Sequence, residues 1–550
     1  MVDFILRKGL AAFVSKQTKI ISAAFFIAAT TILAQVLGFL KYRIMLSEFG
    51  PSSDLGVFFA SFRVPEFLFQ VIIIGAVSSS FIPIFSSLLN KNKEKEAFNF
   101  ASSMLTISLL AFSVVAFVVI IFARELSGIV APGFTDKELD LMANLTRIVM
   151  LSQILFVFAT VFTAILQSFQ HFLIPGIANA LYNVGIILAT LFLADRFGIY
   201  APALGALIGS VLYAGAQFPL LLINKYRARF LLSLNYGIKE VIPLMIPRSL
   251  TIIVTQLALT ANVIFASYIS ARSIVIFDLA QVLMLAPVLL FGQSIAQASF
   301  PVLARKKDDL IAFKDIFVAS FNQILYLTLP ISALFIVLRI PIVRLLYGAR
   351  ESFDWAATVS TGFTLAAFAL SMSAQALIYL LARAFYARHN TRTPFVITLI
   401  SVVINVTLSY TFIRVMNLPI QYLAVSFTIS QWLAFLTMLA ALDKKINFPK
   451  VDMITSVAKI TLASFVMGVS LYIPIKLLDQ LVFDTTRTIN LLILTGIASG
   501  AGLASYLFVT WLLDIRESYA IIAVIKKFKS KARFARQLDE IIDGGSKLNP

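Results

Sequence analysis

Fourteen long apolar runs follow one another along the chain and constrain its fold more than any other feature. A membrane-spanning helix needs about 20 mainly apolar residues. Of the 550 residues, 60% are hydrophobic and 13% are charged, which excludes a water-soluble fold. The short polar gaps leave no room for a separate catalytic domain. We therefore predict an all-α polytopic membrane protein with 14 transmembrane helices, which begin near Ile20, Leu55, Phe98, Leu141, Phe172, Ala201, Val241, Ile274, Ile311, Ala356, Thr393, Leu418, Asp452 and Asn490.

The distribution of basic residues predicts the orientation of these helices. Of the 45 Lys and Arg residues, 29 lie in the terminal segments and in the loops that follow even-numbered helices, whereas 12 lie in the other loops. Basic residues are retained on the cytoplasmic side of membranes, so both termini are predicted to be cytoplasmic. The same distribution accounts for the formal net charge of +18 without a nucleic-acid partner.

Side chains suited to catalysis or metal binding are scarce. The chain has no cysteine, and its two histidines, His171 and His389, fall in short loops. Disulfides and thiolate chemistry are therefore excluded. The predicted helices contain neither paired carboxylates nor a nucleophile beside a base. We predict a protein that is not an enzyme and that binds no metal or cofactor.

The two ends of the chain are predicted to lie at the cytoplasmic surface. Residues 1–19 form a short amphipathic lead-in without the small-residue cleavage site of a signal peptide. Residues 515–550 mix apolar residues with lysines and arginines, a pattern that suits binding to anionic lipid. A solvated basic tail explains the same composition equally well.

Short motifs recur between the two halves at a nearly constant spacing of 218 to 221 residues. Four ordered matches at this spacing indicate an internal duplication of six helices. We predict two six-helix lobes, residues 20–224 and 225–445, related by a pseudo-two-fold axis along the membrane normal. Residues 446–514 hold helices thirteen and fourteen and lie outside the duplication. The matching pairs are Ile32 to Gln35 with Ile253 to Gln256, Ser80 with Ser299, His171 with His389, and Leu204 with Leu423.

Few charged residues lie within the predicted helices, where a charge costs about 2.5–3.5 kcal/mol. Arg63 and Glu66 are three residues apart, so they either neutralise each other or place Arg63 in a cleft between the lobes, where a guanidinium can bind phosphate. Lys41 either lines the same cleft or extends to the membrane surface. Arg248 follows Pro247, and it binds carbonyl groups freed by a proline bend or lines the cleft.

The remaining polar residues within the helices leave a similar choice. Arg147 and Lys459 are near helix ends and are expected to extend to the membrane surface. Asp278 and Gln281 either line the cleft or cap the outer end of helix eight. Amides either join helices or line a wet interior, and as a set they favour an anionic or sugar-bearing cargo. These amides are Gln35, Gln70, Asn179, Asn183, Gln256, Asn262, Gln281, Gln293, Gln297, Gln375 and Asn405.

An ordered set of motifs resembles the MurJ (MviN) family of lipid II flippases. The motifs run in order from helix one to helix eleven, and the set is more specific than any single motif. They are Val36 to Phe39, Ala76 to Pro83, Ala131 to Phe134, Ile246 to Leu250, Asn262 to Ser267, Leu290 to Pro301 and Phe385 to Pro394.

This resemblance implies a member of the multidrug, oligosaccharidyl-lipid and polysaccharide (MOP) exporter superfamily in a bacterial cytoplasmic membrane. Its cargo would be lipid II, the undecaprenyl-diphosphate-linked disaccharide-pentapeptide used for peptidoglycan. Helices thirteen and fourteen would form a groove for the prenyl tail. Lys41 occupies a position at which family members place a cleft cation, and Arg248 fits the proline-arginine pair of helix seven.

Several positions depart from the family pattern. The family pattern has an arginine in helix one, where this chain has Gln35, and a basic pair in helix two, where it has Phe69 and Gln70. It has a second arginine in helix eight, where this chain has Gln281 or Val282, and an acidic residue in helix two, where it has Ile74. These departures imply a weaker grip on the pyrophosphate than in other family members.

We predict an alternating-access flippase that moves lipid II from the inner to the outer leaflet, with Lys41, Arg63 and Arg248 holding the diphosphate. The alternatives are a flippase for another polyprenyl-diphosphate-linked glycan, a drug exporter, or a non-transporting scaffold that recruits cell-wall synthesis proteins. Coupling to the membrane potential or to a monovalent cation has no dedicated carboxylate cluster to support it. The other predicted substrate-binding residues are Gln35, Gln256, Asn262, Asp278 and Gln281.

Overall fold

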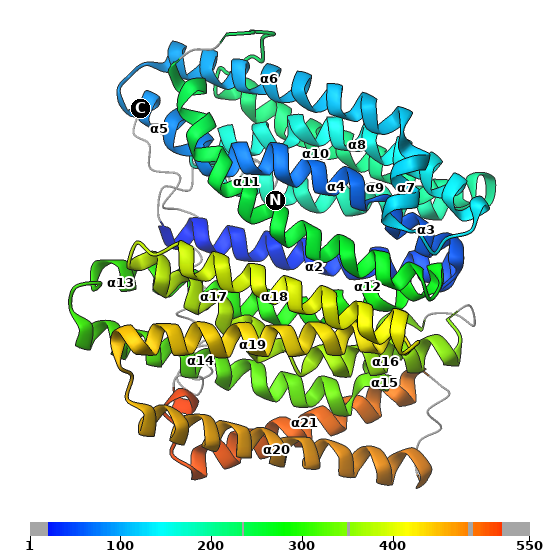
Figure 1. Ribbon diagram of the computed structural model, residues 1–550, viewed down its shortest axis with the longest axis vertical. Coiled ribbons are helices and arrows are strands. Elements are labelled where there is room, and N and C mark those ends of the chain that lie inside the picture. The colour runs from blue at the N-terminus through cyan, green and yellow to red at the C-terminus, as the bar shows by residue number, and fades with distance from the viewer. Residues whose placement is uncertain (1–19, 234–235, 349–352, 482–487, 520–550) are drawn as a thin grey trace, which may run out of the picture. The chain divides into compact units, whose positions relative to one another are not determined.

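The computed structural model describes residues 20–233, 236–348, 353–481 and 488–519 (Figure 1). The predicted amphipathic lead-in and most of the predicted basic tail lie outside the described residues. Every regular element of the described part is helical. Thirteen helices are long and apolar enough to cross a membrane, and one pair of helices bent by 40° supplies a fourteenth span. The fourteen spans coincide with the predicted runs, which confirms the all-α membrane fold.

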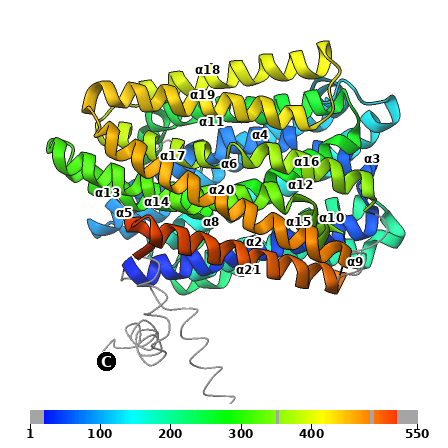
Figure 2. The same cartoon turned by 90° about the horizontal axis from the view of Figure 1, so that it is seen from below.

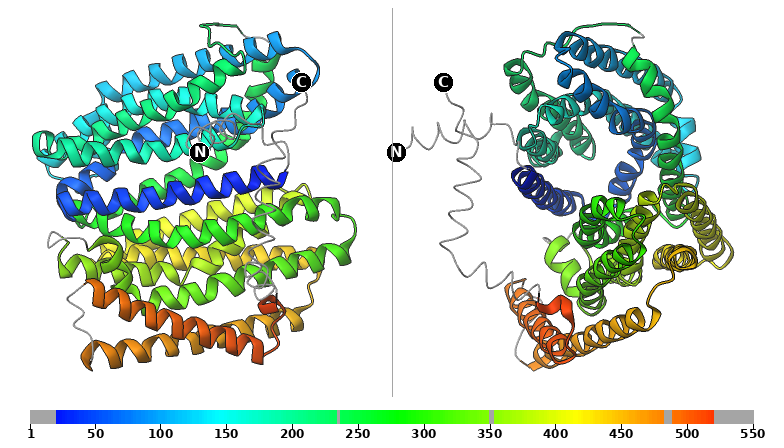
Figure 3. Two further views of the ribbon diagram at one scale, coloured as in Figure 1. Left: turned by 180° about the vertical axis from the view of Figure 1, so that it is seen from behind. Right: turned by 90° about the vertical axis from the view of Figure 1, so that its left-hand side faces the viewer.

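Packing contacts divide the described chain into a first unit, residues 20–264, and a second unit, residues 265–519. Most of helix seven therefore packs with the first unit, while the lobe boundary expected at residues 224 and 225 stays a prediction. In the end-on view of Figure 3, the helices within each unit run roughly parallel. The first unit contains α2 (Ile20–Phe49), α3 (Ser53–Ser61), α4 (Arg63–Phe69), the π-helical segments η1 (Gln70–Ile74) and η2 (Val77–Phe81), α5 (Ile82–Asn90), α6 (Glu94–Ile121), α7 (Ala123–Val130), α8 (Asp136–Ser168), α9 (Leu173–Phe197), α10 (Tyr200–Ile223) and α11 (Tyr236–Ser267), whose last three residues belong to the second unit.

The second unit consists of the following elements. They are α12 (Ala271–Pro287), the π-helical segment η3 (Val288–Gln293), α13 (Ser294–Arg305), α14 (Leu310–Val337), α15 (Arg339–Tyr347), α16 (Trp355–Ala369), α17 (Met372–Ala387), α18 (Arg392–Tyr410), the π-helical segment η4 (Thr411–Val415), α19 (Gln421–Ile446), α20 (Lys450–Leu481) and α21 (Thr488–Leu512).

Glycines bring α9 and α10 of the first unit into close contact. Gly185 of α9 faces Gly205 and Gly209 of α10, and a Cβ atom at any of the three would overlap the opposite helix. Small residues at such crossings allow helix backbones to approach closely in a membrane. On the other side of α9, the Asn183 amide donates a hydrogen bond of 3.3 Å to the Ala34 carbonyl of α2. Asn183 therefore joins helices, which is one of the two roles predicted for the amides.

Aromatic side chains form the core at one end of the first unit. Phe81 stacks on Phe85 at 5.4 Å and on Phe100 at 5.3 Å between ring centroids. Phe169, which follows α8, meets the edge of Phe85 at 5.6 Å. Phe81, Phe85 and Phe100 are at most 1% exposed. This aromatic cluster fixes α5, α6 and the end of α8 against one another.

The bend between α16 and α17 in the second unit has no proline or glycine to mark it. A bend removes helical hydrogen bonds, and carbonyl groups in a membrane need new donors. Side chains of α14, α19 and the bend itself provide them. Thr428 Oγ1 donates to Ala367 (2.7 Å), Ser371 Oγ to Phe368 (2.7 Å), Ser332 Oγ to Ala369 (2.5 Å) and Trp432 Nε1 to Leu370 (2.9 Å).

Helices α20 and α21 lie side by side and attach to α14 of the second unit (Figure 2). The Tyr506 hydroxyl of α21 donates a hydrogen bond of 2.7 Å to the Tyr326 carbonyl of α14. Gly502 of α21 lies directly against Leu471 of α20, where a Cβ atom would overlap the leucine side chain. The last two helices are therefore a packed hairpin of the second unit.

Two backbone features support the predicted duplication. The π-helical segments η1 and η3 begin 218 residues apart, at Gln70 and Val288. Gln170 after α8 and His389 after α17 both have a left-handed backbone, with φ of 65° and 56°. Gln170 and His389 are therefore equivalent at a spacing of 219, and the predicted match of His171 with His389 is wrong by one residue.

The absence of cysteine allows the predicted orientation to be tested by labelling single introduced thiols. We expect Lys137→Cys, at the start of α8, to react with a membrane-impermeant maleimide in spheroplasts. Lys91→Cys, at the end of α5, should react only after the membrane is permeabilised. Both side chains are exposed, so access depends on the side of the membrane. The opposite labelling pattern would reverse the predicted orientation.

The α9–α10 contact predicts a strong difference between two glycines of α10. A Cβ atom at Gly209 would lie 2.5 Å from the Tyr182 carbonyl oxygen, whereas one at Gly215 would have no atom within 4 Å. Gly209→Val should lower the free energy of unfolding by about 1–3 kcal/mol, as overpacked cores do. Gly215→Val carries the same change in helix propensity and serves as the control. Equal melting temperatures of the two variants in detergent would contradict the proposed packing.

Candidate substrate-binding site

Lys41 lies near the end of α2, where the helix packs against α3. Its ammonium is 4.8 Å from the ring centroid of Tyr42, and the side chain is half-buried. The Tyr42 ring in turn meets Phe59 edge-on at 5.6 Å. A cation over an aromatic ring gains electrostatic attraction. Lys41 is therefore held by packed aromatic residues and is not a fully solvated lysine.

Arg63 and Glu66 form the predicted pair at the start of α4. The chain turns at Phe62 between α3 and α4, which places both side chains in the first turn of the new helix. Arg63 Nη1 lies 3.9 Å from Glu66 Oε2, and their side chains are 15% and 42% exposed. This distance is near the limit of an ion pair and exceeds hydrogen-bond length. The ion pair forms, but at this distance Glu66 alone does not fix the orientation of the Arg63 guanidinium.

Arg248 is exposed on α11 beside a residue that fixes the helix in place. The buried Ser249 hydroxyl donates a hydrogen bond of 2.9 Å to the Val71 carbonyl in η1. Gly75 allows this approach, since a Cβ atom there would overlap Ser249. A π-helical turn leaves a carbonyl without its usual helical donor, and Ser249 supplies one. Arg248 is thus positioned by a specific contact between α11 and the irregular segment of helix two.

Gln256 and Asn262 continue the polar residues along α11. They are 9% and 3% exposed. Asn262 Oδ1 is buried and has no hydrogen-bond partner among the described residues. Arg248 and Asn262 lie 14 residues apart, which is about 21 Å along a helix axis. The polar residues of α11 are therefore spread along the helix, with Arg248 exposed and Gln256 and Asn262 buried.

The other predicted residues lie in different surroundings. Gln35 is exposed on α2. In the second unit, Asp278 is half-buried on α12 and Gln281 is 8% exposed. The Tyr347 hydroxyl donates to the Leu279 carbonyl at 3.2 Å, between these two residues. The roles of Gln35, Asp278 and Gln281 in substrate binding stay predictions.

Arg147 and Lys459 bind carbonyl groups at helix ends. Arg147 Nε donates to the Ile120 carbonyl at 3.1 Å, in the last turn of α6. Lys459 Nζ donates to the Leu513 carbonyl at 2.8 Å, just after α21. The last carbonyls of a helix lack helical donors and carry partial negative charge. These two cations therefore stabilise helix ends and are separate from the predicted site.

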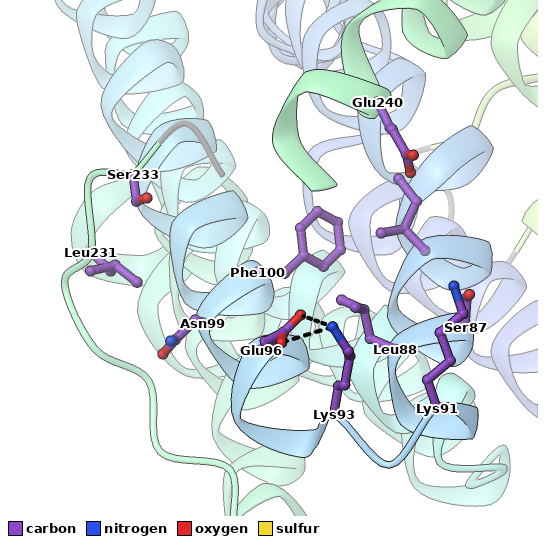
Figure 4. Close-up of a pocket in the computed structure, with 11 residues that line it drawn as sticks. Ser87, Leu88, Lys91, Lys93, Glu96, Asn99, Phe100, Leu231, Ser233 and Glu240 are labelled. Atoms are coloured by element: carbon purple, nitrogen blue, oxygen red, sulfur yellow. Dashed lines mark hydrogen bonds and ion pairs between the residues drawn. The ribbon is translucent and has the colours of Figure 1, made fainter. Parts of the chain in front are cut away.

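A cavity of about 670 Å³ in the first unit was missed from the sequence (Figure 4). It lies between the end of α5, the start of α6, the start of α11 and the loop that precedes α11. Figure 4 shows Lys93 and Glu96 paired in its wall, with 3.0 Å between Lys93 Nζ and Glu96 Oε1, and Glu240 extending from α11. Its volume suits a small molecule. Its lining is Ile84, Ser87, Leu88, Lys91, Lys93, Glu96, Asn99, Phe100, Leu231, Ser233 and Glu240.

No signal in the sequence joins the parts of this cavity. The charged run from Lys91 to Glu96 reads as a cytoplasmic loop, and Leu231 and Glu240 follow more than 130 residues later. None of the predicted substrate-binding residues lines the cavity. Among the residues that the structure describes, no three His, Asp or Glu side chains are grouped to hold a metal ion.

The helical architecture defines the chain as a multi-span membrane protein. Its fold is similar to that of a structure described as a multidrug resistance MATE family transporter of the MOP superfamily, with a TM-score of 0.63 and 16% identity over 75% of this chain and 94% of that one. The sequence model of the family described as lipid II flippase MurJ matches residues 45–513. The chain belongs to the MurJ family.

Similar proteins agree with this assignment. A "Probable lipid II flippase MurJ" of Buchnera aphidicola subsp. Acyrthosiphon pisum is 26% identical over 510 residues, covering 89% of this chain and 96% of the relative. One of Thermotoga maritima is 29% identical over 441 residues, covering 80% and 87%. A structure described as lipid II flippase MurJ in an inward closed conformation matches with a TM-score of 0.75 and 22% identity, over 89% of this chain and 98% of that one. The predicted family is confirmed.

The unsatisfied amide oxygen of Asn262 leads to a prediction that separates a functional role from a packing role. Asn262→Leu removes a buried polar atom that has no described partner, so the melting temperature should stay equal or rise. Transport should fall if the amide contacts the cargo. Asn405 is also 3% exposed but donates to Ser426 Oγ at 3.3 Å, so Asn405→Leu should lower the melting temperature. A loss of stability in Asn262→Leu comparable to that of Asn405→Leu would assign Asn262 to packing.

Proposed function

We propose that this chain moves lipid II from the inner to the outer leaflet of a bacterial cytoplasmic membrane. The observation that carries the proposal is the family match over residues 45–513. Lipid II carries a diphosphate, sugars and a peptide on a prenyl chain, and the described helices offer cations and amides at several depths. Both termini would lie in the cytoplasm, as the distribution of basic residues indicates.

In this proposal, Lys41, Arg63 and Arg248 contact the diphosphate. Guanidinium groups bind phosphate through paired hydrogen bonds, whereas an ammonium acts as a point charge. Gln256 and Asn262, which lie further along α11, would contact its sugars or peptide. Helices α20 and α21 would hold the prenyl tail. The headgroup can shift the equilibrium between two conformations only through different affinities for them.

A related cargo is the second candidate. Gln35, and Gln281 or Val282, occupy the positions where the family resemblance implies arginines. A site with fewer cations suits a cargo that needs fewer contacts to phosphate. Another polyprenyl-diphosphate-linked glycan would be such a cargo. Coupling to the membrane potential or to a monovalent cation, and contact with cell-wall synthesis proteins, remain proposals that this cargo assignment does not require.

Complementation in bacteria depleted of their own lipid II flippase tests the proposal. The unaltered chain should restore growth and the exposure of lipid II on the outer leaflet. Lys41→Ala or Arg248→Ala should reduce that exposure by roughly tenfold, because each removes a charge-assisted contact to phosphate. Arg248→Lys should recover only part of it, since lysine cannot form the paired hydrogen bonds.

Matched controls remove an exposed cation from the ends of other helices. Lys137→Ala at the start of α8 and Arg196→Ala at the end of α9 change the net charge equally, and both side chains are exposed. They should leave lipid II exposure unchanged. Failure of the unaltered, membrane-inserted chain to restore exposure would point to another cargo. Full activity of Lys41→Ala and Arg248→Ala together would point to a non-transporting scaffold.

A further inference from the structure

Four basic side chains gather at one end of the second unit, apart from the predicted substrate-binding residues. Arg383 lies near the end of α17, Arg388 caps that helix, His389 follows it, and Lys307 follows α13. The Lys307 ammonium is 3.3 Å from His389 Nε2, which joins the loops after α13 and α17. The distribution of basic residues predicts that this end faces the cytoplasm. We call these four residues the basic cluster.

Aromatic rings hold the two guanidinium groups of the basic cluster. Arg383 Cζ lies 5.5 Å from the ring centroid of Phe300, and Arg388 Cζ lies 5.9 Å from that of Phe313. Phe313 is 0% exposed, and both arginine side chains are half-buried. Attraction to a ring face restricts the position of a guanidinium. These arginines are thus preorganised, unlike the exposed lysines of a solvated loop.

The basic cluster lacks the anionic partners that half-buried cations need. Among the described residues, no ion pair joins Lys307, Arg383 or Arg388 to a carboxylate, and Arg388 Nη1 is buried without a hydrogen-bond partner. The nearby Asp309 carboxylate is engaged elsewhere, 3.5 Å from Lys306 Nζ and 3.1 Å from the Ala312 amide. That amide lowers the pKa of Asp309. A buried donor without an acceptor is unfavourable, so an external anion that accepts from Arg388 would be stabilising.

The backbone at His389 places its side chain just after the end of α17. The amides of His389 and Asn390 bond to the carbonyls of Tyr386 (2.9 Å) and Phe385 (3.0 Å), which is the helix-ending turn that places one residue in the left-handed region. Glycine usually takes that position because a side chain is strained there. His389 takes it with φ of 56°. Gln170 takes the equivalent position in the first unit with φ of 65°, so the turn accepts a side chain and fixes where the imidazole begins.

Comparison with the first unit separates the charge of the basic cluster from the needs of the fold. At the spacing of 219 residues that equates Gln170 with His389, Arg388 corresponds to Phe169 and Arg383 to Ala164. Phe169 packs against Phe85 and Phe98, and Ala164 is 3% exposed. The same helix end is thus built from apolar residues in the first unit. The cations of the second unit are an addition to that scaffold.

We propose that Lys307, Arg383, Arg388 and His389 form a binding site for a phosphate group, supplied by an anionic phospholipid of the adjacent leaflet. Two guanidiniums and an ammonium match the charge and hydrogen-bond acceptors of a phosphodiester. Basic pockets between membrane helices on the cytoplasmic side bind such headgroups. The site lies within the second unit, and the inference does not depend on the proposed transport of lipid II.

Native mass spectrometry of the full-length, delipidated protein in detergent tests this site. Phosphatidylglycerol, phosphatidylcholine and inorganic phosphate are titrated separately. The unaltered chain should bind one phosphatidylglycerol in preference to phosphatidylcholine. Arg388→Phe, which introduces the first-unit residue, should weaken that binding about tenfold or more without lowering the melting temperature of the lipid-free protein. Arg388→Gln should give the same loss while keeping a polar side chain.

The control is Arg227→Phe, which removes an exposed cation from a loop of the first unit at the end with the same predicted orientation. General attraction to an anionic surface changes affinity by only about fivefold per charge, and it would act equally on both variants. An equal loss in Arg388→Phe and Arg227→Phe would overturn the site. Binding of inorganic phosphate that also depends on Arg388 would overturn the lipid assignment and indicate a soluble phosphate ligand.

Discussion

Backbone hydrogen bonding within the hydrocarbon layer is the constraint on which the rest of the structure depends. A regular helix satisfies its own peptide groups, but every bend or π-helical turn releases carbonyls that water cannot reach. At two of the irregular places, a side chain from a neighbouring helix supplies a donor. Ser249 donates to Val71 in η1, and Trp432 donates to Leu370 at the bend between α16 and α17. Hydroxyl and indole groups thus fix irregular helices to their neighbours.

The same constraint sorts the charged residues within the spans. Arg147 and Lys459 donate to carbonyls at helix ends, so their charges complete the hydrogen bonding of the scaffold. Arg63 instead lies 3.9 Å from Glu66, and Arg248 is exposed beside Ser249. Arg147 and Lys459 therefore serve the backbone, whereas Arg248 is exposed on α11. This exposure makes Arg248 the stronger candidate for contact with an anionic cargo.

Apolar runs predicted the number and positions of the spans because a spanning helix depends on composition over about 20 residues. Local irregularity was harder to predict. The bend at Leu370 and Ser371 has no proline or glycine, and tertiary hydrogen bonds stabilise it. The cavity beside Lys93 joins residues far apart in the chain, so no local pattern marks it. Candidate cations could be identified because a charge within a membrane span is energetically unfavourable. Their actual partners depend on helix packing.

If the predicted duplication is correct, the two halves of the chain have diverged in where their helices are interrupted. In the first unit, the helix corresponding to α16 and α17 is the continuous α8, and Ser152, the counterpart of Ser371, donates to the Ala206 carbonyl at 3.1 Å. Conversely, α3 and α4 are broken at Phe62, whereas their counterpart α12 is continuous. A single scaffold therefore accepts a break at either place once a neighbouring side chain satisfies the released groups. The exchange of Phe169 for Arg388 is a similar case. Helix packing sets the position of the side chain, and the residue at that position can be apolar or charged.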